Sequence, residues 1–294
     1  MQASNGRKGR TVSRAWRAVR ERNEQRCERI LEGADPMDGE DLDWSAVGIH
    51  ELEPATVGCL VYMRDVEAFV DRDLVGLPGH PNTVGDPLIG RFLDIWRAEE
   101  HGHAMLLGRY LDTYAAARGV AVPEQQPTPP ARPSGLERFV ARLGGPVADT
   151  VTATHMAWGA ANELLTLNGY RILSRRCGDP FLAALLNRIS DQEARHYSFY
   201  LLQAEWRLAA SRTARTVLPQ LMRRAWTPVG VGSDFKRPEE FEAVMRHLTR
   251  GEGDAATVHR MDNRFSRLPG LERLRIFGDV FSAATARAAS PAAA

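Results

Sequence analysis

The sequence has little that would serve a disulfide scaffold, a membrane span or an exported protein. Its three cysteines, Cys27, Cys59 and Cys177, are widely scattered and form no CxxC pair. This usage favours a reducing compartment and argues against a thiolate metal centre. No apolar run approaches the roughly 18 residues that cross a bilayer, and the N-terminus lacks the apolar core of a secretory signal. We therefore expect a cytoplasmic protein without a membrane partner.

Lysine is almost absent, because Lys8 and Lys236 are the only two among 38 basic residues and arginine supplies the rest. Acidic residues nearly balance the basic ones, which leaves a formal net charge of +1. A chain so close to neutral is not expected to bind nucleic acid. Arginine is nevertheless dense in the helical stretch from Thr11 to Leu31. That stretch is either a solvated helix face or a docking surface for an acidic partner.

Strand patterns are also scarce, whereas apolar residues recur at intervals of three and four over long stretches, as in amphipathic helices. The Asp-Pro pairs at 86–87 and 179–180 each supply an N-cap followed by proline at the first helical position. We predict long helices at about 49–73, 87–117, 150–174 and from 180, and shorter ones at about 136–143, 213–225, 238–249 and 269–285. The expected architecture is an all-α single domain over residues 11–285, between a disordered N-terminus (1–10) and a flexible tail (286–294).

Two of the long helices carry a glutamate followed three residues later by a histidine: Glu100 with His103, and Glu193 with His196. Residues three apart on a helix share one face, so both side chains can reach the same point. Each pair lies within a stripe of leucine, isoleucine and aromatic residues, which predicts that it points inward. A buried carboxylate requires a partner. That partner is either the histidine alone, as a buried hydrogen bond, or a metal ion.

A glutamate without a histidine precedes each motif inside its own long helix: Glu67 precedes Glu100, and Glu163 precedes Glu193. These spacings suit antiparallel helix hairpins, in which the partners would lie at the same depth. Four helices would then supply four carboxylates and two imidazoles, the ligand set of ferritin-like di-iron bundles. Carboxylate oxygen with imidazole nitrogen suits iron or manganese. We therefore predict a dinuclear metal site in a ferritin-like four-helix bundle core with additional helices.

The chain resembles the soluble acyl-carrier-protein desaturases, the plant stearoyl type and its actinobacterial relatives, from about Asp43-Trp44 to Phe281. Its most specific motifs are Trp96-Arg97-Ala98-Glu99-Glu100-x-x-His103, Asp191-Gln192-Glu193-Ala194-Arg195-His196 and Leu221-Met222-Arg223-Arg224. The resemblance implies that one iron is ligated by Glu67 and His103. It implies that the other is ligated by Glu163 and His196, with Glu100 and Glu193 bridging the two.

The resemblance also implies that Thr166 takes part in proton delivery during oxygen activation, although a threonine bonded to its own helix is an equal interpretation. The chain departs from the family at three places. Gln192 replaces a usual acidic residue, and His101-Gly102 replaces a pair that usually ends in arginine. Ala68-Phe69-Val70 stands where relatives usually have a second acidic or polar residue and then leucine-proline. These changes bear on the hydrogen bonds that tune the irons. We expect His101 itself to face away from the site.

The activity implied by the resemblance is an O2-dependent desaturation that introduces a carbon–carbon double bond into an acyl chain. The implied cofactor is a pair of irons, Fe2+ for oxygen activation. The implied partners are an acyl-carrier protein that carries the substrate, reduced ferredoxin as electron donor and a second copy of the chain in a homodimer. Candidate docking residues for the acidic carrier are the Arg14–Arg29 helix and Arg223-Arg224.

Two other functions remain open. The same di-iron site could insert oxygen, as a hydroxylase or N-oxygenase acting on a carrier-tethered or small substrate in secondary metabolism. A non-enzymatic bundle, either iron-storing or metal-free, is the third possibility.

Overall fold

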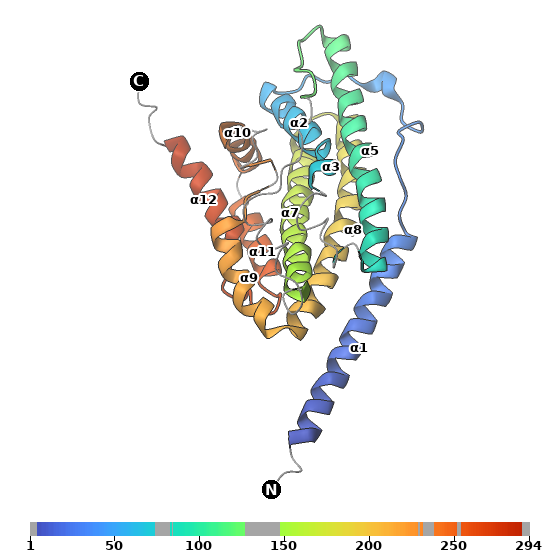
Figure 1. Ribbon diagram of the computed structural model, residues 1–294. Coiled ribbons are helices and arrows are strands. Elements are labelled where there is room, and N and C mark those ends of the chain that lie inside the picture. Colours follow the sequence, from blue (N-terminus) through green and yellow to red (C-terminus); the bar gives the residue numbers. More distant parts are fainter. Residues whose placement is uncertain are drawn as a thin grey trace.

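A computed structural model describes residues 5–73, 83, 85–126, 148–228, 230–231, 238–251 and 254–289. Within these residues the chain is helical and contains no strand, which confirms the all-α prediction (Figure 1). The helix predicted at 136–143 lies outside the described residues. None of the described helices has both the length and the apolar content that a membrane span needs.

Four helices form the bundle that positions the candidate site: α2 (Pro54–Glu67), α5 (Pro87–Arg118), α7 (Ala148–Arg176) and α8 (Pro180–Ala210). Helix α7 packs along α8, and α2 packs along α5 (Figure 1). Two of the four begin where the sequence predicts. The Asp86 side chain accepts hydrogen bonds from the backbone N–H groups of Leu88 and Ile89, and Asp179 accepts one from Leu182. Proline follows each cap, because the first turn of a helix needs no N–H from that residue.

The helix predicted at about 49–73 is shorter than expected. It begins at Pro54 and ends at Glu67, and a separate short helix, α3 (Val70–Asp73), follows. Upstream of Pro54 the backbone N–H of Leu52 donates to the Tyr114 hydroxyl at 2.9 Å instead of joining a helix. Glu67 is therefore the last residue of α2, where the chain is about to turn.

The remaining helices surround the bundle. Helix α1 (Asn5–Glu32), which begins upstream of the expected Thr11, packs on α8 and α5 and projects past the end of the bundle (Figure 1). The C-terminal helices, α9 (Arg212–Ala225), α10 (Pro238–Leu248), α11 (Asp254–Phe265) and α12 (Ile276–Ala289), lie on the other side, by α7 and α2.

Two features of this C-terminal region differ from the prediction. Helix α11 was not predicted, and α12 begins at Ile276 rather than near residue 269. The Asp262 carboxylate of α11 accepts hydrogen bonds from the backbone N–H groups of Phe277 and Gly278 at 3.1 and 3.0 Å. The start of α12 is thus capped by a side chain of the preceding helix, which no local pattern could reveal.

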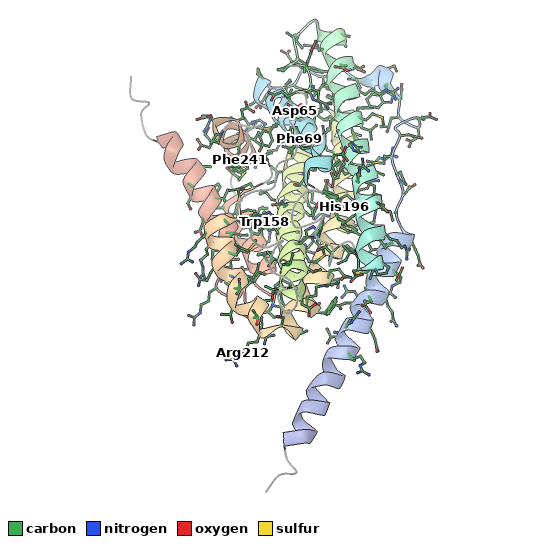
Figure 2. All side chains as sticks on the ribbon, in the orientation of Figure 1. Asp65, Phe69, Trp158, His196, Arg212 and Phe241 are labelled. Carbon is green, nitrogen blue, oxygen red and sulfur yellow. The ribbon has the colours of Figure 1, made fainter. Side chains whose placement is uncertain are left out.

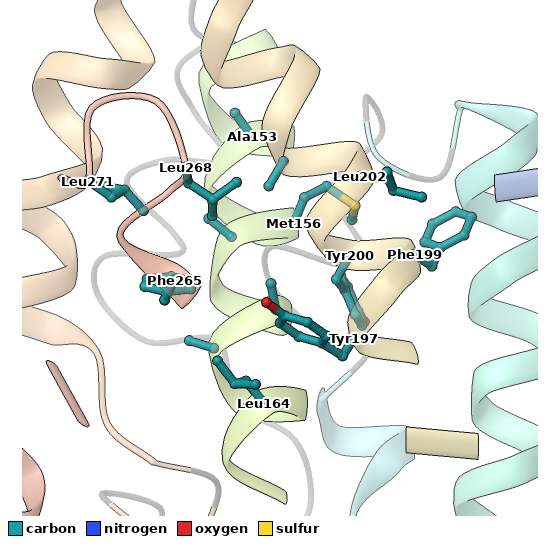
Figure 3. Close-up of a cluster of buried hydrophobic side chains, with 14 of the residues drawn as sticks. Ala153, Met156, Leu164, Tyr197, Phe199, Tyr200, Leu202, Phe265, Leu268 and Leu271 are labelled. Atoms are coloured by element: carbon teal, nitrogen blue, oxygen red, sulfur yellow. The ribbon is translucent and has the colours of Figure 1, made fainter. Parts of the chain in front are cut away.

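Aromatic and aliphatic side chains pack together in the buried core (Figure 3). The Phe92 ring stacks on that of Phe199 with 3.9 Å between ring centroids, which joins α5 to α8. On α7, Gly159 faces the Tyr200 ring so closely that a Cβ atom at this position would come within 2.4 Å of it. The glycine therefore allows α7 and α8 to approach along the turn that precedes Glu163.

Candidate metal centre

The six side chains that the sequence singles out as metal ligands meet in the interior of the bundle. They are Glu67 of α2, Glu100 and His103 of α5, Glu163 of α7, and Glu193 and His196 of α8, and His196 is labelled in Figure 2. None is more than 6% exposed. They form two groups, in each of which one ligand atom per residue lies within 4.8 Å of the others, and Glu100 and Glu193 belong to both.

The two shared glutamates present one oxygen to each group. The Nδ1 atom of His103 lies 3.3 Å from Glu100 Oε2 and 3.2 Å from Glu193 Oε1. The Nδ1 atom of His196 lies 3.1 Å from Glu100 Oε1 and 3.6 Å from Glu193 Oε2. Glu67 Oε2 completes the first group at 3.9 Å from His103 Nδ1, and Glu163 Oε2 completes the second at 3.7 Å from His196 Nδ1. This arrangement suits two neighbouring cations that share two carboxylates.

The four carboxyl groups fall into two electrostatic classes. Burial and the charge of Glu100 raise the pKa of Glu67 to about 8, and burial and the charge of Glu193 raise the pKa of Glu163 well above its ordinary value. Burial would also raise the pKa values of Glu100 and Glu193, but short electrostatic contacts with the neighbouring ligand residues outweigh it and lower both. At neutral pH and without metal, Glu67 and Glu163 are therefore neutral acids, and the two shared glutamates are anions.

The two histidines balance these anions. Burial alone would lower the pKa values of His103 and His196, but their contacts with the surrounding carboxylates hold both well above the ordinary value. Two imidazolium cations thus neutralise two carboxylates in the metal-free protein. Two divalent ions would replace the protons of both imidazoles and of both neutral acids, so the site would stay neutral when loaded.

Several buried atoms of the site have unsatisfied hydrogen-bonding capacity. Neither carboxylate oxygen of Glu193 has a hydrogen-bond partner among the described residues, and neither does Nδ1 of His196. Leaving a buried polar atom unpaired costs about 1–3 kcal/mol, more if the group is charged. A set of buried Glu–His hydrogen bonds would not leave these atoms unpaired, whereas metal coordination satisfies them. The site therefore fits metal ions, and its oxygen and nitrogen donors suit iron or manganese.

The two glutamates that are not shared, Glu67 and Glu163, are the outer glutamates of the site. Each accepts a hydrogen bond from a side chain to which the sequence analysis gave no role. The Tyr170 hydroxyl donates to Glu67 Oε1 at 2.5 Å, and the Trp96 indole N–H donates to Glu163 Oε1 at 3.0 Å. Tyr170 lies seven residues after Glu163 on the same helix, a spacing of about two turns. That helical spacing was the one available sequence indication that Tyr170 faces the site.

The histidines are held from outside by Glu99 and Gln192, which also had no assigned contact. The Nε2 atom of His196 lies 2.7 Å from Glu99 Oε2, and that of His103 lies 2.7 Å from Gln192 Oε1. In both cases Nδ1 is therefore the atom left facing the carboxylates. Such outer contacts fix the tautomer and the ring orientation of a metal-binding histidine.

Thr166 lies beside the candidate metal centre, whereas His101 lies at the protein surface. The Thr166 hydroxyl donates to the backbone carbonyl of Asn162 at 3.1 Å, as in the alternative interpretation of a threonine bonded to its own helix. Thr166 also lines a pocket that it shares with Glu67. His101 is exposed and pairs with Asp71 at 3.4 Å, so it faces away from the site as expected.

An apolar pocket reaches the metal centre at Glu67. It holds about 830 Å³ of empty space, a figure that includes open solvent at its mouth. Its walls come from α2, α7 and the C-terminal helices, and include Tyr62, Met63, Leu165, Ile172, Phe241, Val244, Met245, Met261 and Phe277. The helix that sequence reasoning missed, α11, thus contributes to the pocket.

The structure shows buried glutamate and histidine groups that can hold metal ions beside an apolar pocket. No protein-family model, curated protein or solved structure matches this chain.

Proposed function

We propose that this protein is an O2-dependent di-iron acyl-[acyl-carrier-protein] desaturase, which introduces a carbon–carbon double bond into a carrier-bound acyl chain in the cytoplasm. The observation that carries the proposal is the position of Glu67. Its carboxylate belongs to the first ligand group, and Glu67 is also one of the residues that line the apolar pocket. A hydrocarbon chain in that pocket would therefore lie against the metal centre. The motif resemblance to the desaturase family is the second support.

The walls of the pocket suit a hydrocarbon better than a polar metabolite. Glu67 is the one acidic residue among the lining residues that the structure describes, and no basic residue is among them. The polar side chains of Thr166, Asn168 and Thr249 donate to the backbone carbonyls four residues earlier, at Asn162, Leu164 and Met245, and the Thr257 hydroxyl accepts from Arg260. Each of these side chains is thus engaged within the protein, and most of the surface left to a ligand is apolar.

A pair of ferrous ions supplies, when bound, the electrons that activate dioxygen and the oxidising power to take hydrogen from an unactivated carbon. The protein's own residues provide the setting. Glu100 and Glu193 would each ligate both ions, and Glu67 and Glu163 would each ligate one of them. Burial of all six ligands excludes bulk water, which protects an oxidising site from side reactions.

Arg223 and Arg224 are the favoured docking residues for the acidic carrier protein. Both are exposed in the last turn of α9. The helix is followed by Trp226, whose ring packs edge-on against the pocket residue Phe277 with 5.6 Å between centroids. A carrier bound there would lie close to the pocket wall. On α1, by contrast, Arg20 is already paired with Glu24 at 2.7 Å. Reduced ferredoxin as electron donor and a homodimeric assembly complete the proposal.

A second candidate is a di-iron oxygenase that hydroxylates or N-oxygenates a carrier-tethered or small substrate. The observation that favours it is Gln192, which contacts His103 where the desaturases that the chain resembles usually have an acidic residue. A different set of outer contacts can redirect the same metal centre toward oxygen insertion.

Mass spectrometry of the acyl product separates the two candidates. Iron-loaded protein would be incubated with oxygen, reduced ferredoxin and acyl-carrier proteins of varied acyl length. Desaturation removes two hydrogens from the acyl group, whereas hydroxylation adds one oxygen. A Glu100→Ala variant, which lacks a shared ligand, serves as the inactive control. Unchanged acyl mass at every chain length, with the site fully loaded, would contradict both candidates.

A further inference from the structure

The residue that precedes each shared glutamate contacts the histidine of the opposite motif. Glu99, before Glu100 on α5, reaches across to His196 on α8, and Gln192, before Glu193 on α8, reaches across to His103 on α5. Both contacts span 2.7 Å from Nε2 to oxygen. The two acceptors differ, because one is a carboxylate and the other is an amide.

The amide at Gln192 is fixed by its surroundings. Its Nε2 atom donates to the backbone carbonyl of Asp35 at 2.5 Å, so its oxygen must face His103. A glutamate at this position would bring a carboxylate oxygen against that carbonyl, where no donor offsets the repulsion. Gln192 is 3% exposed, so its own side chain has little access to water. The neutral partner of His103 is therefore specified by the loop that follows α1.

The Glu99 carboxylate is also stabilised by its surroundings. Glu99 is 2% exposed, and its second oxygen accepts from Arg195 Nη2 at 2.6 Å. Arg195 itself is partly exposed. This ion pair provides the buried carboxylate with a compensating charge.

The two histidines are thus unequal metal ligands. A hydrogen bond to a carboxylate is roughly twice as strong as one to a neutral acceptor, and it makes the imidazole a stronger donor. The two outer glutamates, Glu67 and Glu163, also differ in their surroundings. Glu67 ends α2 and borders the pocket, and its Oε1 is held by the Tyr170 hydroxyl at 2.5 Å. Glu163 lies in the middle of α7, with a longer contact of 3.0 Å to Trp96.

We propose that the two metal positions load in sequence, with divalent ions bound first and more tightly by the His196 group and then more weakly by the His103 group. Gln192 and Glu99 act as positioning residues that set this order through the histidines. The weaker position is the one beside the apolar pocket. The inference rests on the dinuclear site of the proposed function, but it is independent of the reaction catalysed there.

Equilibrium dialysis of metal-free protein against Co2+ at fixed pH tests the order. The native protein should show two classes of site whose affinities differ by about tenfold or more. Glu99→Gln gives both histidines an amide partner, so the tighter class should weaken by about 10–100-fold and approach the weaker one. Asp191→Asn removes an exposed carboxylate from α8 near the site and should change neither class.

A second variant covers the case in which Glu99→Gln does not fold. Gln192→Leu removes the acceptor of His103, so the weaker class should weaken further while the tighter class stays unchanged. Circular dichroism of both variants checks that the helices persist. Two equal affinities in the native protein, or variants that weaken both classes alike, would overturn the inference.

The dialysis tests the loading order, and the acyl assay tests the proposed reaction, so either proposal can be contradicted without the other. Two equal sites in a protein that still desaturates would overturn the loading order alone. Two unequal sites in a protein that leaves every acyl chain unchanged would contradict the proposed reaction and leave the order standing.

Discussion

The Tyr170 hydroxyl on α7 donates to Glu67 Oε1 on α2 at 2.5 Å, in a buried contact beside the candidate metal centre. Glu67 is the last residue of α2, so this hydrogen bond fixes a carboxyl group at the end of its helix. The contact links the ligand group, the pocket wall and the helix that carries Glu163.

Replacing Tyr170 with phenylalanine should destabilise the loaded protein more than the metal-free one. In both states Tyr170→Phe leaves the buried Oε1 of Glu67 unpaired, at a cost of about 1–3 kcal/mol when the acid is neutral. A bound ion ionises Glu67, and a hydrogen bond to a carboxylate is roughly twice as strong, so thermal denaturation with and without metal measures the difference. Tyr110→Phe is the matched control, because it removes a phenol–carboxylate bond to Asp179 at 3.1 Å outside the ligand groups. Its cost should be the same in both states, and equal metal dependence of the two variants would contradict the assignment.

Metal binding should release about four protons for every two ions near neutral pH. The protons come from the neutral acids Glu67 and Glu163 and from the two imidazolium groups, whose pKa values are all raised. Affinity should therefore fall steeply as the pH is lowered. A pH-stat titration of metal-free protein measures the protons directly, and release of fewer than two would contradict the protonation states described above.

The same groups predict how the stability of the metal-free protein depends on pH. Each has a folded pKa above its unfolded value, so its stabilisation is complete below the unfolded pKa and is lost as the pH rises toward the folded pKa. For the histidines this loss begins near pH 6.5, and for Glu67 it extends to about pH 8. The gain in melting temperature on adding metal should therefore grow from pH 6 to pH 8. A gain that shrinks over this interval would contradict the account.

Removing one shared glutamate should affect both metal positions. Glu193 presents Oε1 to one group and Oε2 to the other, so Glu193→Gln should reduce bound metal from two ions per chain to one or fewer. Elemental analysis after gel filtration measures the ratio. Asp191→Asn, on the same helix but exposed, should keep both ions. Two tightly held ions in Glu193→Gln would show that this carboxylate is not shared.

Filling the apolar pocket should shorten the preferred acyl chain. Val244 of α10 lines the pocket, and Val244→Trp would occupy space needed by the distal carbons. Each excluded methylene loses about 0.8 kcal/mol of burial, which corresponds to about a fourfold loss of kcat/KM. Val217→Trp, at an exposed position on α9, is the control. Equal losses for short and long acyl chains would place the substrate elsewhere.

The sequence predicted well those features whose determinants are local or periodic. The Asp-Pro caps of α5 and α8 were found because cap and proline are adjacent. The clustering of the six glutamate and histidine side chains was predicted because helical spacing puts Glu100 with His103 and Glu193 with His196, and because each long helix carries a glutamate at matching depth.

What the sequence could not predict depends on how distant helices face each other. Glu99 contacts His196 only because α5 and α8 face each other across the site, and Gln192 is oriented by a carbonyl at Asp35. The start of α12 depends on Asp262 in another helix. Periodicity specifies which face of a helix is buried, but it does not specify which residue lies opposite.

Mössbauer spectroscopy of protein loaded with 57Fe tests the central claim most directly. The account predicts two irons per chain which, because they share Glu100 and Glu193, couple magnetically after oxidation into a pair without net spin. Magnetically isolated ferric ions, or well under one iron per chain in a folded protein, would contradict a shared site between α2, α5, α7 and α8.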